Sequence, residues 1–151
     1  MPAEFSSNAA QVVPANSGVI FTEALVPCTQ GLIYHKDGSA IFRVANKFFK
    51  QNIMSGWRRN TNYTVSFHAN IAIPTGGTVE PISLAVAVDG EIEPASTMTI
   101  TPAAVEEFGN VGAEVLITVP FVCMCSNVSI RNISTQAITV QNANLVIEQG
   151  G

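Results

Sequence analysis

The sequence is poor in charged side chains. Only 12% of its 151 residues are Asp, Glu, Lys or Arg, whereas 47% are hydrophobic. About a quarter of the residues of an ordinary soluble domain are charged, so this chain has few charges with which to cover a monomer. We therefore expect part of its apolar surface to be buried between subunits. The alternative is a monomeric sandwich with a neutral surface.

Other features are missing as well, and each absence excludes a class of function. No apolar run approaches the ~18 residues of a membrane span, so no membrane partner is expected. Eleven acids against seven bases give a net charge of −4, which disfavours a general nucleic-acid-binding role. The start, MPAEFSSNAAQVVPANSG, has neither the basic residues nor the apolar core of a signal peptide. The expectation is assembly inside a cell.

Cysteine and histidine are scarce. Cys123 and Cys125 are two apart on a predicted strand and point to one face, while Cys28 lies far away in the sequence. We expect them to be small buried hydrophobes, although a bridge from Cys28 to one of the pair stays open. Neither His35 nor His68 lies in a metal-binding or hydrolase motif. We predict no catalytic residue, no metal site, no cofactor and no enzymatic activity.

The clearest pattern present is a long alternating stretch from Thr61 to Ile73. Large apolar residues occupy every second position from Tyr63 onward, and polar residues face the other way. Such a strand belongs in the middle of a sheet. The chain as a whole shows about eight or nine strands with short turns and one helical turn at 102–108, which predicts an all-β, antiparallel two-sheet jelly-roll sandwich.

A second strand, Val111 to Cys125, is apolar on both faces. A sandwich core buries one face of a strand, so the other face, with Leu116, Pro120 and Val122, is predicted to lie against another subunit. The polar side of the Thr61 to Ile73 strand is a further candidate for this contact. The predicted trimer interface is His68, Asn70, Leu116, Thr118, Pro120 and Val122.

The domain organisation is predicted to be an extended arm over residues 1–17, without a strand, followed by a jelly-roll domain over 18–151. The arm would lie on its own domain, on a sister subunit or on another partner. Asn46 to Asn60 holds more than half of the chain's bases and no acid. It is either a partner-contact segment or an aromatic cluster packed beneath a long loop. The candidate partner-contact residues (capsid or receptor) are Phe5, Phe48, Phe49, Lys50, Trp57, Arg58 and Arg59.

Several blocks carry a resemblance to a known family: IFRV from Ile41, NYTVSFHANI from Asn62, LAVAVDGE from Leu84, TPAAV from Thr101 and VQNANLVI from Val140. Together they resemble the C1q/tumour-necrosis-factor-like jelly roll, in particular its bacterial and phage branch with the heads of collagen-like spore-surface proteins and phage decoration proteins. The resemblance covers roughly Gly18 to Gln149. It implies a compact homotrimer.

From this resemblance and the features above we expect a structural, non-enzymatic virion protein. The first hypothesis is a phage capsid decoration (cement) protein that binds the major capsid protein, located in the virion after assembly in the host cytoplasm. The alternative is a receptor- or glycan-binding trimeric head of a fibre, spore-surface or adhesin protein, located on a cell or spore surface. A secreted C1q- or cytokine-like ligand is a third hypothesis.

Overall fold

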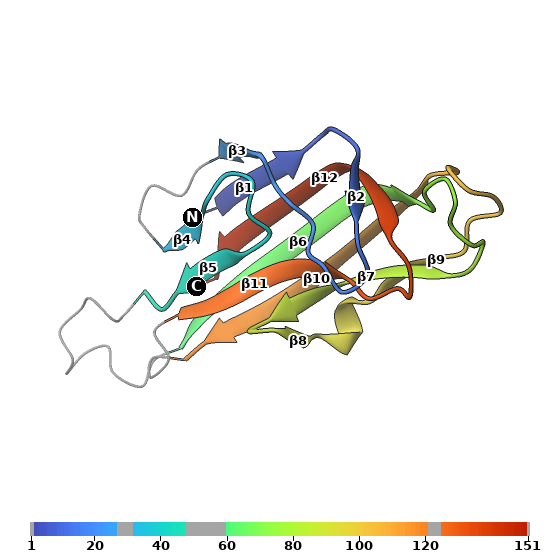
Figure 1. The fold of residues 1–151 in the computed structure, drawn as a ribbon. Helices are drawn as coiled ribbons and strands as arrows, with labels where there is room; N and C mark the ends of the chain where they lie inside the picture. Colours follow the sequence, from blue (N-terminus) through green and yellow to red (C-terminus); the bar gives the residue numbers. More distant parts are fainter. Residues whose placement is uncertain (1, 27–31, 48–59, 121–124, 151) are drawn as a thin grey trace, which may run out of the picture.

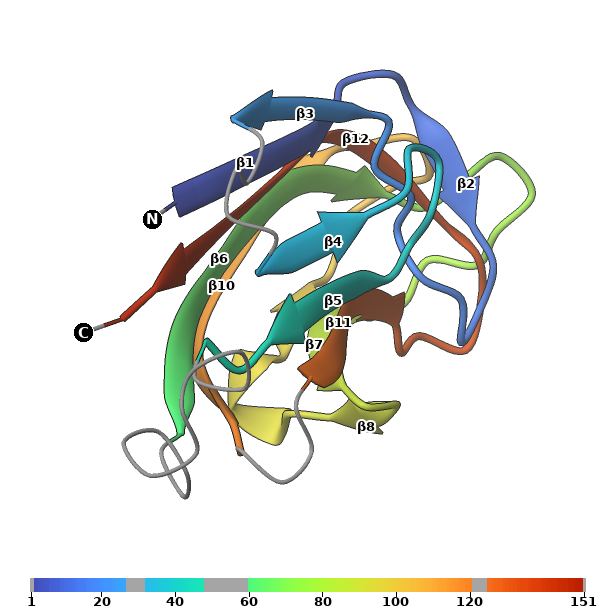
Figure 2. The same cartoon turned by 90° about the vertical axis from the view of Figure 1, so that its left-hand side faces the viewer.

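The computed structural model describes residues 2–26, 32–47, 60–120 and 125–150, and they form two antiparallel sheets that face each other (Figures 1 and 2). Sheet A has the order β10 (Gly109–Val119), β6 (Thr61–Ala72), β12 (Ile138–Gln149), β1 (Pro2–Ser7) and β3 (Glu23–Val26), with β2 (Gln11–Val13) also paired to β12. Sheet B has the order β4 (Ile33–His35), β5 (Phe42–Ala45), β11 (Cys125–Asn132), β7 (Ile82–Val88) and β8 (Glu91–Ile92), with β9 (Met98–Ile100) also paired to β7. The predicted all-β, two-sheet jelly roll is confirmed.

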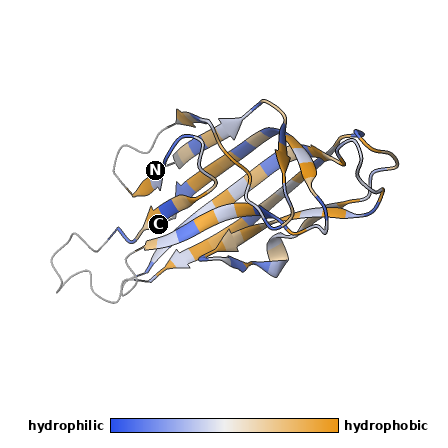
Figure 3. Cartoon of the chain, viewed as in Figure 1, coloured by the Kyte–Doolittle hydropathy of each residue, from blue (hydrophilic) through white to orange (hydrophobic). Residues whose placement is uncertain are grey.

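Strand β6 is an interior strand of sheet A, as its sequence pattern predicts. It pairs with β10 on one side and with β12 on the other. Its buried residues alternate with exposed or half-buried ones up to Asn70, and the same alternation of apolar and polar positions runs along the neighbouring strands (Figure 3). The inward residues Tyr63, Val65 and Phe67 belong to the single apolar core between the sheets.

An aromatic cluster fills one part of this core. Phe42 lies at its centre, with ring centroids 4.7 Å from Phe5, 5.2 Å from Phe21 and 4.1 Å from His35. His35 Nε2 is 2.8 Å from the carbonyl oxygen of Ser39, which can only accept, so Nε2 carries the proton. These rings come from four strands or connections of both sheets, and they join the two layers.

The amino-terminal segment is not an arm, and this prediction is wrong. Residues Pro2–Ser7 form β1 between β12 and β3, and Gln11–Val13 form β2. Ala3 and Phe5 are opposite Ile147 and Leu145 of β12 and point into the core, where Phe5 is 4% exposed. The segment therefore lies on its own sandwich, and Phe5 is not available to contact a partner.

The helical turn predicted at 102–108 is also wrong. In the part of the chain that the structure describes, the one helix is the 3-10 turn η1 (Pro94–Ser96). Residues 101–108 form turns instead, because Glu106 has φ +61 in the left-handed region and donates its N–H to the Ile73 carbonyl at 2.7 Å. The described residues form twelve strands, against the predicted eight or nine, because the amino-terminal segment contains β1 and β2 and the predicted strand over 91–101 is divided into β8 and β9. No described helix is long and apolar enough to cross a membrane.

Candidate functional site

The candidate site is the surface of sheet A that points away from the core, here called the outer face of sheet A. Because side chains alternate along a strand, every second residue of the neighbouring strands contributes to it. Cross-strand partners in the register place these residues side by side. They are Asn110, Gly112, Glu114, Leu116 and Thr118 of β10; Asn62, Thr64, Ser66, His68 and Asn70 of β6; Asn144, Val146 and Glu148 of β12; and Glu4 of β1.

Four of the six predicted interface residues lie together on this face. His68 is opposite Gly112, and Asn70 is opposite Asn110. Leu116 is opposite Thr64 and is 68% exposed. The fourth residue, Thr118, lies on the same strand as Leu116. Pro120 is half-buried just beyond the end of β10, and Val122 lies outside the described residues.

The second face of β10 is less apolar than the sequence suggests. Leu116 is surrounded on its own strand by Glu114 and Thr118, and the strand ends at Val119. The expectation of a continuous apolar face depended on Pro120, which follows the end of β10, and on Val122, which lies outside the described residues. The face therefore presents one large exposed apolar side chain among short polar ones.

The polar side chains of this face are bonded to one another across the strands. Thr118 Oγ1 donates to Asn62 Oδ1 at 2.9 Å, and Ser66 Oγ donates to Glu114 Oε2 at 3.0 Å. Two further pairs are Asn110 Nδ2 to Asn70 Oδ1 at 3.1 Å and Asn144 Nδ2 to Glu4 Oε2 at 3.0 Å. Buried polar groups cost free energy when they lack partners. These bonds satisfy part of the face, whereas Thr64, His68 and Glu148 have no described side-chain hydrogen bond. A second surface that covers this face therefore has to supply partners for its glutamates.

The described basic residues of the chain all lie on the side of sheet B. The strands of sheet A contain four glutamates, Glu4, Glu23, Glu114 and Glu148, and no Lys or Arg. Every Lys and Arg among the described residues lies on sheet B or next to one of its strands: Lys36, Arg43, Lys47 and Arg131. A partner for the outer face of sheet A should therefore bring neutral or basic side chains.

The remaining partner-contact residues, Phe48, Phe49, Lys50, Trp57, Arg58 and Arg59, lie outside the described residues. Their segment joins β5 to β6. The hydroxyl of Tyr63 in β6 donates to the carbonyl of Ala45 at the end of β5, at 2.5 Å. The described residues on either side of this segment thus lie at one end of the sandwich, while the loops that carry Glu80, Glu106 and Glu107 lie at the end where β6 finishes.

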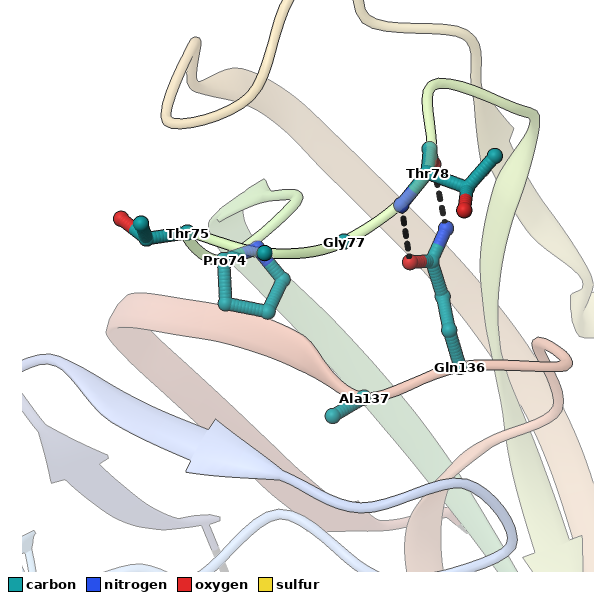
Figure 4. Close-up of a pocket in the computed structure, with 7 residues that line it drawn as sticks. Pro74, Thr75, Gly77, Thr78, Gln136 and Ala137 are labelled. Carbon is teal, nitrogen blue, oxygen red and sulfur yellow. Dashed lines mark hydrogen bonds between the residues drawn. The ribbon is translucent and has the colours of Figure 1, made fainter.

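A cavity of about 370 Å³ lies among the loops of that acidic end (Figure 4), lined by Pro74, Thr75, Gly76, Gly77, Thr78, Gln136 and Ala137. The Gln136 amide is fully used inside the protein: Oε1 accepts from the Thr78 N–H at 2.9 Å and Nε2 donates to the Thr78 carbonyl at 2.7 Å. Only glycine fits at position 77, where a Cβ would lie 2.5 Å from Ile73 Cγ2. We assign no site to this cavity because no charged side chain lines it and its amide is already paired.

A row of exposed side chains on the other sheet is not predicted by any motif of the sequence. Tyr34 of β4 is 63% exposed. It lies opposite Arg43 of β5, which in turn lies opposite Asn127 of β11. The only sequence signal for Tyr34 is its position between two inward residues, Ile33 and His35, which predicts that its ring points outward.

Comparison with known proteins supports the fold and no more. No family profile matches the sequence, and no curated protein matches it. Murine APRIL is similar in structure, with a TM-score of 0.63 and 8% identity over 98% of this chain and 99% of that chain. The Eiger TNF of S. frugiperda has a TM-score of 0.64 and 9% identity over 98% of this chain and 91% of that chain. The chain therefore has a TNF-like jelly-roll fold.

Proposed function

We propose that this chain is a structural, non-enzymatic protein that assembles into a homotrimer through the outer face of sheet A. The observation that carries this proposal is Leu116, which is 68% exposed on the edge strand of a face where four pairs of polar side chains are bonded to one another. Large exposed apolar side chains are typical of interfaces. The low charge content of the sequence has the same explanation.

β10 is the edge strand of sheet A, so a neighbouring copy can approach the face and the edge together. A closed ring of three copies covers this edge in every copy, which protects it from open-ended pairing.

Replacing Leu116 by aspartate is expected to dissociate the trimer. The substitution places a carboxylate beside Glu114, on a face that already lacks bases, and this charge would be buried without a partner in the assembly. Sedimentation velocity at micromolar concentration measures the result. Val79→Asp is the matched control, because Val79 is an exposed valine in the loop between β6 and β7. Equal assembly of the two variants would contradict the proposed interface.

Within this structural role, we propose in the first place a capsid decoration protein that binds the major capsid protein of a phage and resides in the virion. The support is the uneven charge. The sequence places Lys47, Lys50, Arg58 and Arg59 between β5 and β6, and the described Lys47 lies next to the start of β6, at the opposite end from Glu106. One end of the molecule is therefore suited to an acidic shell.

Mixing the protein with undecorated phage heads tests this role. We expect binding to heads, and we expect Arg58→Glu combined with Arg59→Glu to weaken it at least about tenfold at low salt, because rim charges steer and hold such contacts. A matched double change, Lys36→Glu with Arg131→Glu, should bind as the wild type does. No binding, or equal loss in both variants, would refute the capsid contact. Deleting residues 1–14 is unsuitable, because it removes β1 and β2 from sheet A.

The second candidate function is a receptor- or glycan-binding trimeric head on a cell or spore surface. One specific observation favours it: the exposed row of Tyr34, Arg43 and Asn127 on sheet B. If sheet A is turned inward by assembly, this row stays on the outside. It would then be free to contact a ligand.

A further inference from the structure

We infer that the outer face of sheet B binds an acidic oligosaccharide through Tyr34, Arg43 and Asn127. This deepens the second candidate function by naming its site and ligand class. It depends on the fold of one chain and not on the homotrimer.

The three side chains form a straight row across three strands. Tyr34 is the direct cross-strand partner of Arg43, and Arg43 is the direct partner of Asn127. Neighbouring strands lie about 4.8 Å apart, so the row has the length of a short oligomer. Asp89 closes the row at the β7–β8 turn, where its Oδ1 accepts from the Asn127 N–H at 2.9 Å.

None of the three side chains has a polar partner within the described part of the chain. No hydrogen bond joins the Tyr34 hydroxyl, the Arg43 guanidinium or the Asn127 amide to another group there, and no ion pair is formed. The polar side chains on the outer face of sheet A, in contrast, are bonded to one another. The row therefore presents free donors and acceptors, as a ligand surface does.

The apolar component of the row suits a sugar ring. Tyr34 exposes 63% of its surface. Its ring therefore contributes little to the apolar core and is available to a ligand. Ile41, also exposed, shares the outward face with Arg43 because the two are two residues apart on one extended segment. A flat aromatic ring with a polar tip beside hydrogen-bonding groups matches a ligand with one apolar face and a hydroxyl-bearing edge.

Arg43, at the centre of the row, favours an acidic ligand. The Arg43 guanidinium is a planar fork that pairs with a carboxylate through two parallel hydrogen bonds. Asp89 lies at the other end of the row, where its Oδ1 accepts from the Asn127 N–H, so a ligand carboxylate is expected at Arg43. A uronic-acid oligomer can place its ring on Tyr34, its carboxylate on Arg43 and its hydroxyls on Asn127.

A peptide strand is a poorer fit than a sugar. Peptides that extend a sheet bind through the free backbone groups of an edge strand. Arg43 and Asn127 lie on β5 and β11, which pair with strands on both sides over much of their length. The row is therefore recognised through side chains, and an acidic peptide becomes an alternative outcome of the test.

The test is an NMR titration of the ¹⁵N-labelled protein with tetragalacturonic acid, with neutral galactotetraose as the matched probe. We expect shifts confined to β4, β5 and β11, and weaker binding of the neutral sugar. Arg43→Gln should weaken binding of the acidic sugar at least about tenfold, because it removes a charge-assisted bond. Tyr34→Ala should have a similar effect, whereas Tyr34→Phe should keep the ring contact and most of the affinity.

The control is Arg131→Gln, since Arg131 lies on the same face but donates to the Gly90 carbonyl at 3.2 Å. It should bind the acidic sugar as the wild type does. The inference is overturned if neither sugar binds, if Arg43→Gln and Tyr34→Ala bind normally, or if only a polyglutamate peptide binds. Sedimentation of the same variants keeps the two proposals separate, because a monomer that binds the sugar would refute the homotrimer alone.

Discussion

Replacing Phe5 by alanine is expected to lower the free energy of unfolding by about 3–5 kcal/mol. The ring is 4% exposed and lies between both sheets, with centroids 4.7 Å from Phe42 and 5.2 Å from His35. Its removal leaves a cavity in the aromatic cluster that the surrounding rings can fill only partly. Urea denaturation, followed by circular dichroism at fixed protein concentration, measures the change.

The matched control for Phe5→Ala is Val12→Ala, also in the amino-terminal segment, because the Val12 side chain is exposed on β2. We expect this change to stay within about 0.5 kcal/mol. The contrast separates a strand from a loosely attached arm. If Phe5→Ala were as mild as Val12→Ala, the segment would not be part of sheet A.

Replacing Asn132 by alanine is the second large effect, with an expected loss of about 3 kcal/mol or more. The residue is fully buried at the end of β11. Its Nδ2 donates to the carbonyls of Val13 and Gln136, both at 2.9 Å, and its Oδ1 accepts from the Ser134 N–H at 2.8 Å. Alanine leaves these three backbone groups unpaired, each at the cost of a buried unsatisfied group.

Asn127→Ala is the internal standard for Asn132→Ala, because Asn127 lies on the same strand with an exposed side chain that has no described partner. Its removal should change stability by no more than about 0.5 kcal/mol. Thermal and urea unfolding of the two variants measure the difference. Similar free energies of unfolding for the two variants would show that the Asn132 amide does not stabilise the turn between β11 and β12.

The centre of the fold could be predicted from the sequence because its pattern is long. In β6 buried residues alternate with exposed or half-buried ones from Thr61 to Asn70. A period of two over that length is inconsistent with a helix. The Asp89-Gly90 dipeptide also predicts a hairpin turn, because Asp-Gly favours turns with positive φ at both central residues. Both residues adopt positive φ in the structure.

The amino-terminal strands β1 and β2 could not be predicted because their pairing partner, β12, lies at the other end of the chain. β1 has only Ala3 and Phe5 as inward residues, and its identity as a strand depends on pairing with β12, over 130 residues later. Within the segment alone, prolines and small polar residues favour a loop. The turn at 101–108 was misjudged for a similar reason: Glu106 is held by a bond to Ile73, which the local sequence does not reveal.

The candidate surfaces required the same long-range information. His68 and Leu116 could each be assigned an outward position from strand periodicity, but their common face follows from the pairing of β6 with β10. The absence of bases from the strands of sheet A, and the location of the described bases on or next to sheet B, depend on which strands share a sheet. The row of Tyr34, Arg43 and Asn127 combines three strands whose register no single segment determines.

The most direct test of the proposed assembly is sedimentation equilibrium of the wild-type protein at micromolar concentration. We expect one species with three times the 16.0 kDa mass of the chain, and a shift toward the single-chain mass for Leu116→Asp. A stable wild-type monomer of 16.0 kDa would contradict the claim that the outer face of sheet A is an assembly surface.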